Sequence, residues 1–338
     1  MNFLFACGGT AGHINPAVAL AQRLGSLMPD SKFLFIGAEG NMELELVPKE
    51  GYEIKAVKAG SLHRSLRPDE LLKNFRSVYY ICVSTRRAKK IIREFKPDAV
   101  LGTGGYVCYP VIRAASELGI PTLIHESNAF PGLTTRMLEK YADRVMLGFE
   151  ESRSFYKHPE KAVFTGTPAR SGFEQRGSEE AKKELGIENV PLAVSFWGSL
   201  GASHMNEVTA HMIAMNERDG AFRHIHASGG ENAPEKMTAI LGGAELKYTE
   251  IRRYIYDMPL VMAAADVVIC RSGASTLCEL TAMGKPAVLV PSVNVTNNHQ
   301  EKNARVLADR GGALLIREED CTPRRLYDAV VGLCRDPG

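Results

Sequence analysis

The first glycine-rich stretch of the sequence, residues 8–13, carries a side chain that could accept a proton. It reads Gly-Gly-Thr-Ala-Gly-His and directly follows a short apolar run. Glycines permit a tight turn and close approach of a ligand, and the exposed amides at a helix start attract anions or hydroxyl oxygens. Histidine changes charge near neutral pH, so His13 is a candidate general base. Glu126, within His-Glu-Ser-Asn at residues 125–128, is the second candidate. The alternative is that both side chains only order their loops, and that residues 8–13 are only a turn.

Two further small-residue turns lie in the second half of the chain, each between an apolar run and a helical pattern. Residues 198–203 read Gly-Ser-Leu-Gly-Ala-Ser, and residues 271–279 read Arg-Ser-Gly-Ala-Ser-Thr-Leu-Cys-Glu. Two such turns at one sheet edge make a cradle for a diphosphate, with the Ser199 hydroxyl and the amides of residues 274–276 as donors. Glu279 could accept hydrogen bonds from ribose hydroxyls, or it could be a solvated helix residue.

Neither a metal nor a cofactor is expected from the sequence. No Asp-x-Asp or Asp-x-Glu pair occurs near a predicted strand end, and residues 125–129 lack the second histidine of a zinc-binding helix. Helix amino termini and Arg170 could instead stabilise the charge of a leaving group, although Arg170 could also be an ordinary surface residue. His13 stands where a dinucleotide-binding turn needs Gly or Ala, which argues against NAD.

The elements that must position these residues alternate between short apolar runs and longer amphipathic stretches. Strands are predicted at residues 3–6, 33–36, 54–57, 99–101, 122–124 and 145–147, and again at 192–196, 224–226, 267–270, 287–290 and 313–316. Repeated β/α units form parallel sheets, so we predict an α/β protein with two Rossmann-like, doubly wound domains, residues 1–162 and 163–338. Ligands bind beyond the carboxyl ends of such strands, which predicts an active site in a central cleft between the domains.

Composition is that of an ordinary globular protein. The 338 residues are 45% hydrophobic and 24% charged, and the formal net charge of +2 is too small for a general nucleic-acid binder. Seven cysteines without a Cys-x-x-Cys pair indicate a reduced, cytosolic chain. The amino terminus does not resemble a signal peptide, and no apolar run approaches the roughly 20 residues of a spanning helix.

Membrane contact, if any, must therefore be peripheral, and one stretch could provide it. Apolar residues between Leu71 and Cys82 precede a basic cluster consisting of Arg86, Arg87, Lys89, Lys90, Arg93 and Lys96. A basic amphipathic pair of helices of this kind could rest on anionic lipid. The alternative is a core-facing stripe with a solvated basic face.

Taken together, six motifs resemble those of the MurG family of GT-B glycosyltransferases, glycosyltransferase family 28, over nearly the whole chain. They are residues 8–16, 102–107, 125–128, 166–170, 271–279 and 299–304. The resemblance implies inverting transfer of GlcNAc from UDP-GlcNAc to the C4 hydroxyl of MurNAc in undecaprenyl-diphosphate-linked muramyl pentapeptide (lipid I), which forms lipid II for the cell wall. It also implies a peripheral enzyme on the cytoplasmic face of the cell membrane, in contact with anionic lipid and with cell-wall synthesis proteins.

The same resemblance assigns roles to particular residues. On the donor side, Ile255 would meet uracil through its backbone, Glu279 the ribose, Ser199 and Arg170 the diphosphate, and Gln300 the GlcNAc hydroxyls. The remaining donor contacts would come from Ala274, Ser275, Thr276, Leu277 and Cys278. The acceptor side would use Thr10, Ala11 and Gly12 with the loop of Gly104, Gly105 and Tyr106, and Asn128 would contact the donor sugar. For Ile255 the alternative is core packing.

This sequence departs from the family at three places. Residues 197–202 read Trp-Gly-Ser-Leu-Gly-Ala instead of Gly-Gly-Ser-Gln-Gly-Ala, and Thr167 replaces an Asn. The family continues beyond the equivalent of residue 338, so a terminal helix is expected to be missing.

The competing functions are another GT-B transferase acting on a lipid, a UDP-GlcNAc epimerase or hydrolase, a non-catalytic sugar-nucleotide-binding homologue and an NAD-dependent oxidoreductase.

Overall fold

The structure, a computed structural model, describes residues 1–58, 68–170, 172–173, 176–187, 189–198, 201–230 and 232–335. Within these ranges, the side chains of residues 68–79 and 296 are not described. The chain forms two compact units, Met1–Ser171 and Gly172–Gly338. Ser199 and the apolar side chains at 71–79 of the basic stretch therefore lie outside the described part.

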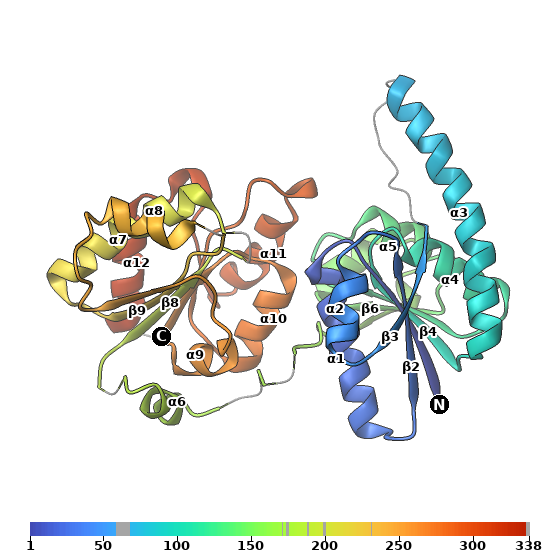
Figure 1. Cartoon of the computed structure of the whole chain (residues 1–338), viewed down its shortest axis with the longest axis horizontal. Helices are drawn as coiled ribbons and strands as arrows, with labels where there is room; N and C mark the ends of the chain where they lie inside the picture. The colour runs from blue at the N-terminus through green and yellow to red at the C-terminus, as the bar shows by residue number, and fades with distance from the viewer. Residues whose placement is uncertain are drawn as a thin grey trace. The chain divides into compact units, whose positions relative to one another are not determined.

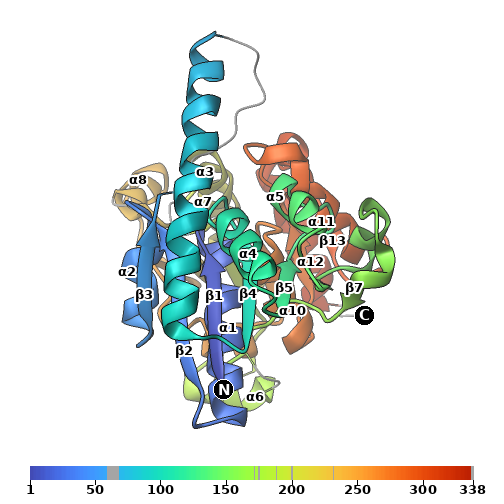
Figure 2. The ribbon, with the colours of Figure 1, turned by 90° about the vertical axis from the view of Figure 1, so that its right-hand side faces the viewer.

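The first unit contains a seven-stranded parallel sheet (Figures 1 and 2). Its strands are β1 (Asn2–Cys7), β2 (Lys32–Ala38), β3 (Glu53–Val57), β4 (Ala99–Gly104), β5 (Thr122–Glu126), β6 (Arg144–Leu147) and β7 (Ala162–Phe164). The order across the sheet is β3-β2-β1-β4-β5-β6-β7, and every neighbouring pair is parallel. β7, a short edge strand with two exposed residues, is the strand of this sheet that the sequence did not predict.

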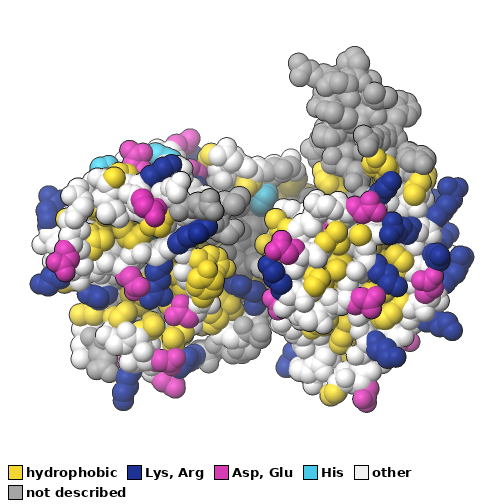
Figure 3. Space-filling view, viewed as in Figure 1, with side chains coloured by type: hydrophobic (Ala, Val, Ile, Leu, Met, Phe, Trp, Pro, Cys, Tyr) yellow, Lys and Arg dark blue, Asp and Glu magenta, His cyan; other side chains and the backbone are white. Residues whose placement is uncertain are grey.

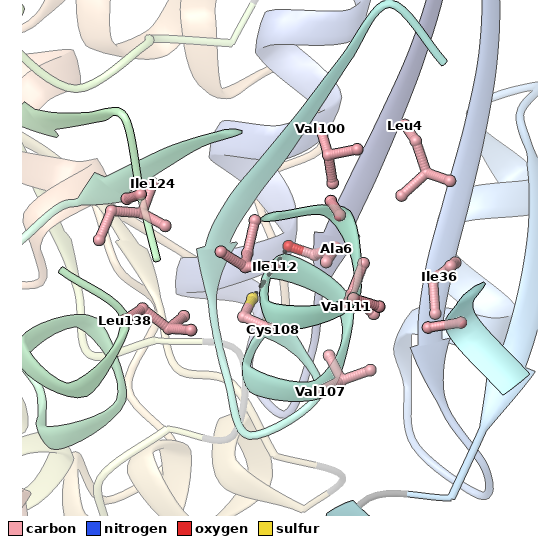
Figure 4. Packing of buried hydrophobic residues seen from close by; sticks show 14 of the residues in the cluster. Leu4, Ala6, Ile36, Val100, Val107, Cys108, Val111, Ile112, Ile124 and Leu138 are labelled. Carbon is pink, nitrogen blue, oxygen red and sulfur yellow. Dashed lines mark hydrogen bonds between the residues drawn. The ribbon is translucent and has the colours of Figure 1, made fainter. Parts of the chain in front are cut away.

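Helices cover both faces of this sheet. They are α1 (Ala11–Leu27), α2 (Glu43–Lys49), α3 (Pro68–Phe95), α4 (Cys108–Glu117) and α5 (Leu133–Leu138), with 3-10 turns η1 (Glu150–Phe155) and η2 (Pro159–Lys161). Because successive strand residues point to opposite faces, Phe3 and Phe5 of β1 pack with α1, whereas Leu4 and Ala6 pack with α4. Figure 4 shows the second layer, in which the Cys108 thiol donates a hydrogen bond to the Ala6 carbonyl oxygen at 3.1 Å.

The basic stretch is one continuous helix, α3, so the predicted pair of helices is wrong. No Gly or Pro lies between Pro68 and Phe95, so this stretch contains no helix breaker. In its second half, Ala88, Ile91 and Ile92 are buried in the core while the Arg86, Arg87, Lys90 and Arg93 side chains are exposed. This half therefore has a core-facing stripe and a solvated basic face. Figure 3 shows Lys and Arg side chains in dark blue on the right of this unit.

The second unit repeats the architecture with a six-stranded parallel sheet, β10-β9-β8-β11-β12-β13. Its strands are β8 (Leu192–Phe196), β9 (Arg223–Ala227), β10 (Thr249–Arg252), β11 (Val267–Cys270), β12 (Ala287–Leu289) and β13 (Leu314–Leu315). The helices are α6 (Ser178–Glu184), α7 (Ser203–Asp219), α8 (Ala233–Ile240), α9 (Met258–Ala264), α10 (Ala274–Met283), α11 (His299–Ala308) and α12 (Pro323–Arg335), with 3-10 turns η3 (Thr296–Asn298) and η4 (Glu318–Asp320).

The predicted fold class, two Rossmann-like parallel-sheet domains, is confirmed. Strand β10 was missed because it is a polar edge strand in which Glu250 pairs with Arg252, 2.7 Å apart. No helix in the described ranges is long and apolar enough to cross a membrane.

Candidate functional site

The loop between β1 and α1 holds the imidazole ring of His13. Its Nδ1 atom lies 2.9 Å from the carbonyl oxygen of Gly8 and 3.4 Å from Oγ1 of Thr10. A carbonyl oxygen only accepts hydrogen bonds, so Nδ1 carries the proton and, in the neutral ring, Nε2 carries the lone pair. Thr10, Ala11 and Gly12 are exposed beside it. The arrangement leaves Nε2, without a proton in the neutral ring, next to backbone that a ligand can reach.

The predicted acceptor loop after β4 packs directly on this first loop. The amide of Gly8 donates to the carbonyl oxygen of Gly104 at 3.2 Å, and Thr103 Oγ1 donates to the carbonyl oxygen of His13 at 2.7 Å. Gly104 and Gly105 have φ values of +126° and +89°. A Cβ atom would lie 2.3 Å from the His13 ring at Gly104 and 2.3 Å from the Gly8 carbonyl oxygen at Gly105. Only glycine fits at both places, so His13 and this loop pack directly against each other. Tyr106, in the same loop, has an exposed side chain.

Glu126, the second candidate base, is 4% exposed and holds its own loop together. Its Oε1 accepts from the backbone and side-chain amides of Asn128 at 3.0 and 3.1 Å, and its Oε2 accepts from the Gly132 amide at 2.9 Å. These three hydrogen bonds match the loop-ordering alternative and orient Asn128. The neighbouring His125 is buried, which lowers its pKa, and its Nε2 donates to the Gly166 carbonyl oxygen at 3.2 Å.

One residue near His13 was missed by the sequence analysis. Glu43, the first residue of α2, is completely buried, and its carboxylate accepts hydrogen bonds from the amides of Gly9 and Ala38 at 3.0 and 2.9 Å. In the sequence it is one of several acidic residues at a helix start, where acidic side chains are common for helix-dipole reasons. The available signals were the glycines at positions 8 and 37, where a Cβ atom would lie 2.2 Å from this carboxylate and 2.5 Å from the Cγ atom of Glu43.

In the second unit, the turn between β11 and α10 exposes backbone donors. Gly273 begins α10 without a side-chain cap, so the amides of residues 274–276 point from an uncapped helix terminus. The Ser275 hydroxyl is buried and has no hydrogen-bond partner among the described residues. Oxygen atoms of a bound anion could accept hydrogen bonds from these amides and from the Ser275 hydroxyl, as expected of an anion site. Leu277 packs in the core, and burial raises the pKa of the Cys278 thiol to about 11, so it stays neutral.

Two predicted nucleoside contacts of this unit are buried. Glu279 is 5% exposed, so it is not a solvated helix residue. Ile255 is 2% exposed, and its side chain packs inside, so any ligand contact it makes goes through its backbone. It lies between the exposed Tyr254 and Tyr256, whose ring centroids are 4.9 Å apart.

Gln300, the predicted sugar contact, lies at the start of α11, next to the loop between β11 and α10. Its Oε1 accepts from the Ser292 amide at 2.9 Å, and its carbonyl oxygen accepts from Ser272 Oγ at 2.8 Å. With Oε1 engaged, the group that Gln300 offers a sugar hydroxyl is its Nε2 donor. Arg170 is half-buried in the segment of the first unit that follows β7. Among the described residues, no three His, Cys, Asp or Glu side chains gather as a metal site.

Two Rossmann-like units, each with glycine-rich turns at the carboxyl ends of parallel strands, are the architecture of the GT-B class of glycosyltransferases. The chain belongs to glycosyltransferase family 28: its residues 3–147 match the family's N-terminal domain and residues 194–337 match its C-terminal domain. The family resemblance seen in the sequence is thereby confirmed.

Curated relatives match over almost the full chain. The UDP-N-acetylglucosamine--N-acetylmuramyl-(pentapeptide) pyrophosphoryl-undecaprenol N-acetylglucosamine transferase of Acetivibrio thermocellus is 44% identical over 337 residues, which cover 99% of this chain and 90% of the relative. The protein of the same name from Caldanaerobacter subterraneus subsp. tengcongensis is 41% identical over 344 residues, covering 100% and 92%.

Solved structures agree on the architecture. Acinetobacter baumannii MurG superposes with a TM-score of 0.77 at 27% identity, covering 98% of this chain and 90% of that one. A UDP-GlcNAc 2-epimerase from Neisseria meningitidis gives a TM-score of 0.65 at 13% identity, covering 100% and 92%. The second likeness concerns the fold alone.

Proposed function

We propose that this protein transfers N-acetylglucosamine from UDP-GlcNAc to the C4 hydroxyl of MurNAc in undecaprenyl-diphosphate-linked muramyl pentapeptide. The reaction would convert lipid I into lipid II for peptidoglycan synthesis. The observation that carries the proposal is the 44% identity over 337 residues to a relative whose name states this donor, acceptor and transfer.

His13 is the proposed general base of the first unit. As the C4 hydroxyl attacks the anomeric carbon, its proton passes to Nε2, the nitrogen left with a lone pair by the 2.9 Å Nδ1 contact to Gly8. The new C–O bond forms as the bond to UDP breaks, with inversion at the anomeric carbon and an oxocarbenium-like transition state. The loop of Gly104, Gly105 and Tyr106 is the proposed support for the acceptor, since it contacts the base directly.

The second unit is the proposed holder of the donor. The uncapped start of α10 and the Ser275 hydroxyl, which has no partner among the described residues, support diphosphate binding there. Their dipoles stabilise the charge that develops on UDP. Glu279 is assigned to the ribose, the backbone of Ile255 to uracil and Nε2 of Gln300 to the sugar. Ser199 and Arg170 are assigned to the diphosphate on the family resemblance alone.

The membrane-facing part of the proposal rests on α3. Exposed Arg86, Arg87, Lys90 and Arg93 form a basic face that would hold the protein peripherally on anionic lipid at the cytoplasmic side, close to its lipid-linked acceptor. Cell-wall synthesis proteins are proposed partners because they would act on the same lipid-linked substrate.

The test is UDP release from UDP-GlcNAc with and without a lipid-diphosphate-MurNAc acceptor analogue, in the presence of EDTA, for the wild type and His13→Ala. We expect acceptor-dependent release that survives EDTA, and a fall in kcat of about 10²- to 10⁴-fold for His13→Ala, the size of a general-base contribution. Saturable UDP-GlcNAc binding without release would instead identify a non-catalytic sugar-nucleotide-binding homologue. Release without acceptor would indicate a hydrolase.

A further inference from the structure

A single peptide group lies between the buried carboxylate of Glu43 and the ring of His13. The N–H of this group, on Gly9, donates to Oε2 of Glu43 at 3.0 Å. Its carbonyl oxygen, on Gly8, accepts from Nδ1 of His13 at 2.9 Å. A trans peptide is planar and directs its N–H and C=O to opposite sides, so the two contacts hold one rigid unit from both ends.

We propose that Glu43 is a positioning residue for His13, acting through the Gly8–Gly9 peptide group. The inference rests on the proposed role of His13 as the base. Glu43 sets the orientation of the peptide, and the peptide sets the tautomer and the orientation of the imidazole. Its negative charge also polarises the amide toward the carbonyl oxygen, which strengthens the bond from Nδ1 and makes Nε2 a better proton acceptor.

The surroundings of Glu43 indicate that this carboxylate serves the loop. It is completely buried, and among the described residues no Lys or Arg forms an ion pair with it. Desolvating a carboxylate is costly unless hydrogen bonds compensate, and its partners are the amides of Gly9 and Ala38. The charge is thus held by backbone donors from two strand ends, one of which belongs to the His13 loop.

The space around the peptide group is equally restricted. A Cβ atom at Gly8 would lie 2.2 Å from Oε1 of Glu43, and one at Gly105 would lie 2.3 Å from the Gly8 carbonyl oxygen. Glycine at both positions lets the carboxylate approach from one side and the acceptor loop from the other. A peptide packed this closely has little freedom to rotate, which is what an orienting group requires.

The experiment compares Glu43→Gln with Glu45→Gln in the 338-residue chain. Glu45 lies on the same helix, its side chain is 73% exposed, and it pairs only with Lys49 in the described structure, so its variant controls for the loss of one charge. For Glu43→Gln we expect kcat to fall about tenfold to a hundredfold, less than the about 10²- to 10⁴-fold of a lost base. KM for UDP-GlcNAc should stay within about twofold, and the acid limb of the kcat/KM profile should move to lower pH. A purely structural role would leave that limb in place.

A second readout does not depend on turnover. Nitrogen-15 NMR of histidine-labelled protein reports which ring nitrogen carries the proton, and His13→Gln identifies the His13 signals among the nine histidines. The wild type should show a protonated Nδ1 at His13, and Glu43→Gln should shift these signals whereas Glu45→Gln should not. If Glu43→Gln folds poorly, Glu43→Asp replaces it, because it keeps the charge but retracts it from the Gly9 amide. Its His13 signals should then shift from those of the wild type, whereas Glu45→Gln should leave them unchanged.

The outcomes separate the two proposals. Unchanged His13 signals and an unchanged pH profile in Glu43→Gln overturn the positioning role, whatever His13 does. A wild type without acceptor-dependent UDP release overturns the proposed function, while the NMR comparison still decides whether Glu43 orients His13.

Discussion

The guanidinium group of Arg271 lies over the indole ring of Trp197, with 5.6 Å between the guanidinium carbon and the ring centroid. The same guanidinium donates to the carbonyl oxygens of Val290 and Pro291, each at 3.1 Å, and to the Glu318 carboxylate at 2.7 Å. One side chain thus connects the carboxyl ends of β8, β11 and β12. Both small-residue turns of the second unit begin next to this pair, so it is placed to determine their geometry.

We predict that Arg271→Lys weakens donor binding. A lysine lacks the planar fork that stacks and donates several bonds at once, so KM for UDP-GlcNAc should rise about tenfold, equivalent to about 1.4 kcal/mol. Trp197 is the single tryptophan, and its emission should change in the variant. Arg305→Lys, at a helix side chain 45% exposed, is the control. Unchanged KM and emission would show that the turns do not depend on this pair.

Gly104→Ala should abolish most activity without unfolding the protein. The new Cβ atom would overlap the His13 ring, 2.3 Å away, and the φ value of +126° adds backbone strain. Steady-state kinetics should show a large fall in kcat. Gly119→Ala is the matched control, because its φ of +70° is also positive but no atom of the described residues lies within 4 Å of the new Cβ. Equal losses in both variants would mean that backbone strain alone is responsible.

Ser275→Ala should separate binding from stability. The hydroxyl is buried without a partner among the described residues, so its removal costs the free protein little and could stabilise it. If the hydroxyl binds the donor diphosphate, KM for UDP-GlcNAc should rise by a factor equivalent to about 1–3 kcal/mol. Thermal unfolding with and without UDP measures both effects. A variant destabilised without UDP and unaltered in KM would contradict the assignment.

The second unit should lose stability in acid because of two buried histidines. Burial lowers the pKa of His224 to about 3 and that of His226 well below its ordinary value, and both rings contact Ser195 Oγ, at 2.8 and 2.6 Å. Below pH about 6.5 the unfolded chain binds protons that the folded unit does not, so stability falls as pH falls, by about 1.4 kcal/mol per pH unit for each histidine.

The measurement is urea unfolding at pH 7, 6 and 5, followed by Trp197 fluorescence, which reports on this unit. His224→Gln should flatten the pH dependence, whatever its stability at pH 7, because it removes one of the two histidines that take up protons on unfolding. His211→Gln, on an exposed face of α7, should keep the wild-type slope. Equal slopes in all three proteins would exclude His224 as the source.

Local pattern in the sequence was enough for the architecture and for the turns that carry the proposed site. The run Phe-Leu-Phe-Ala followed by Gly-Gly-Thr-Ala-Gly-His predicts a buried strand, a tight turn and a helix start, since each depends on neighbouring residues only. Eleven such strands were predicted from this kind of signal. The two edge strands β7 and β10 were not, because short or polar edges lack an apolar run.

Only the tertiary structure decided which side chains act together. Glu43 and Gly9 are 34 residues apart, and Arg271 and Glu318 are 47 apart, so neither pair leaves a periodic trace in the sequence. Burial likewise distinguishes Glu279 from a solvated helix residue and makes one face of α3 a core contact. The chain order of strands and turns follows from local propensity, whereas the contact between the buried Glu43 carboxylate and the His13 loop depends on how distant segments pack.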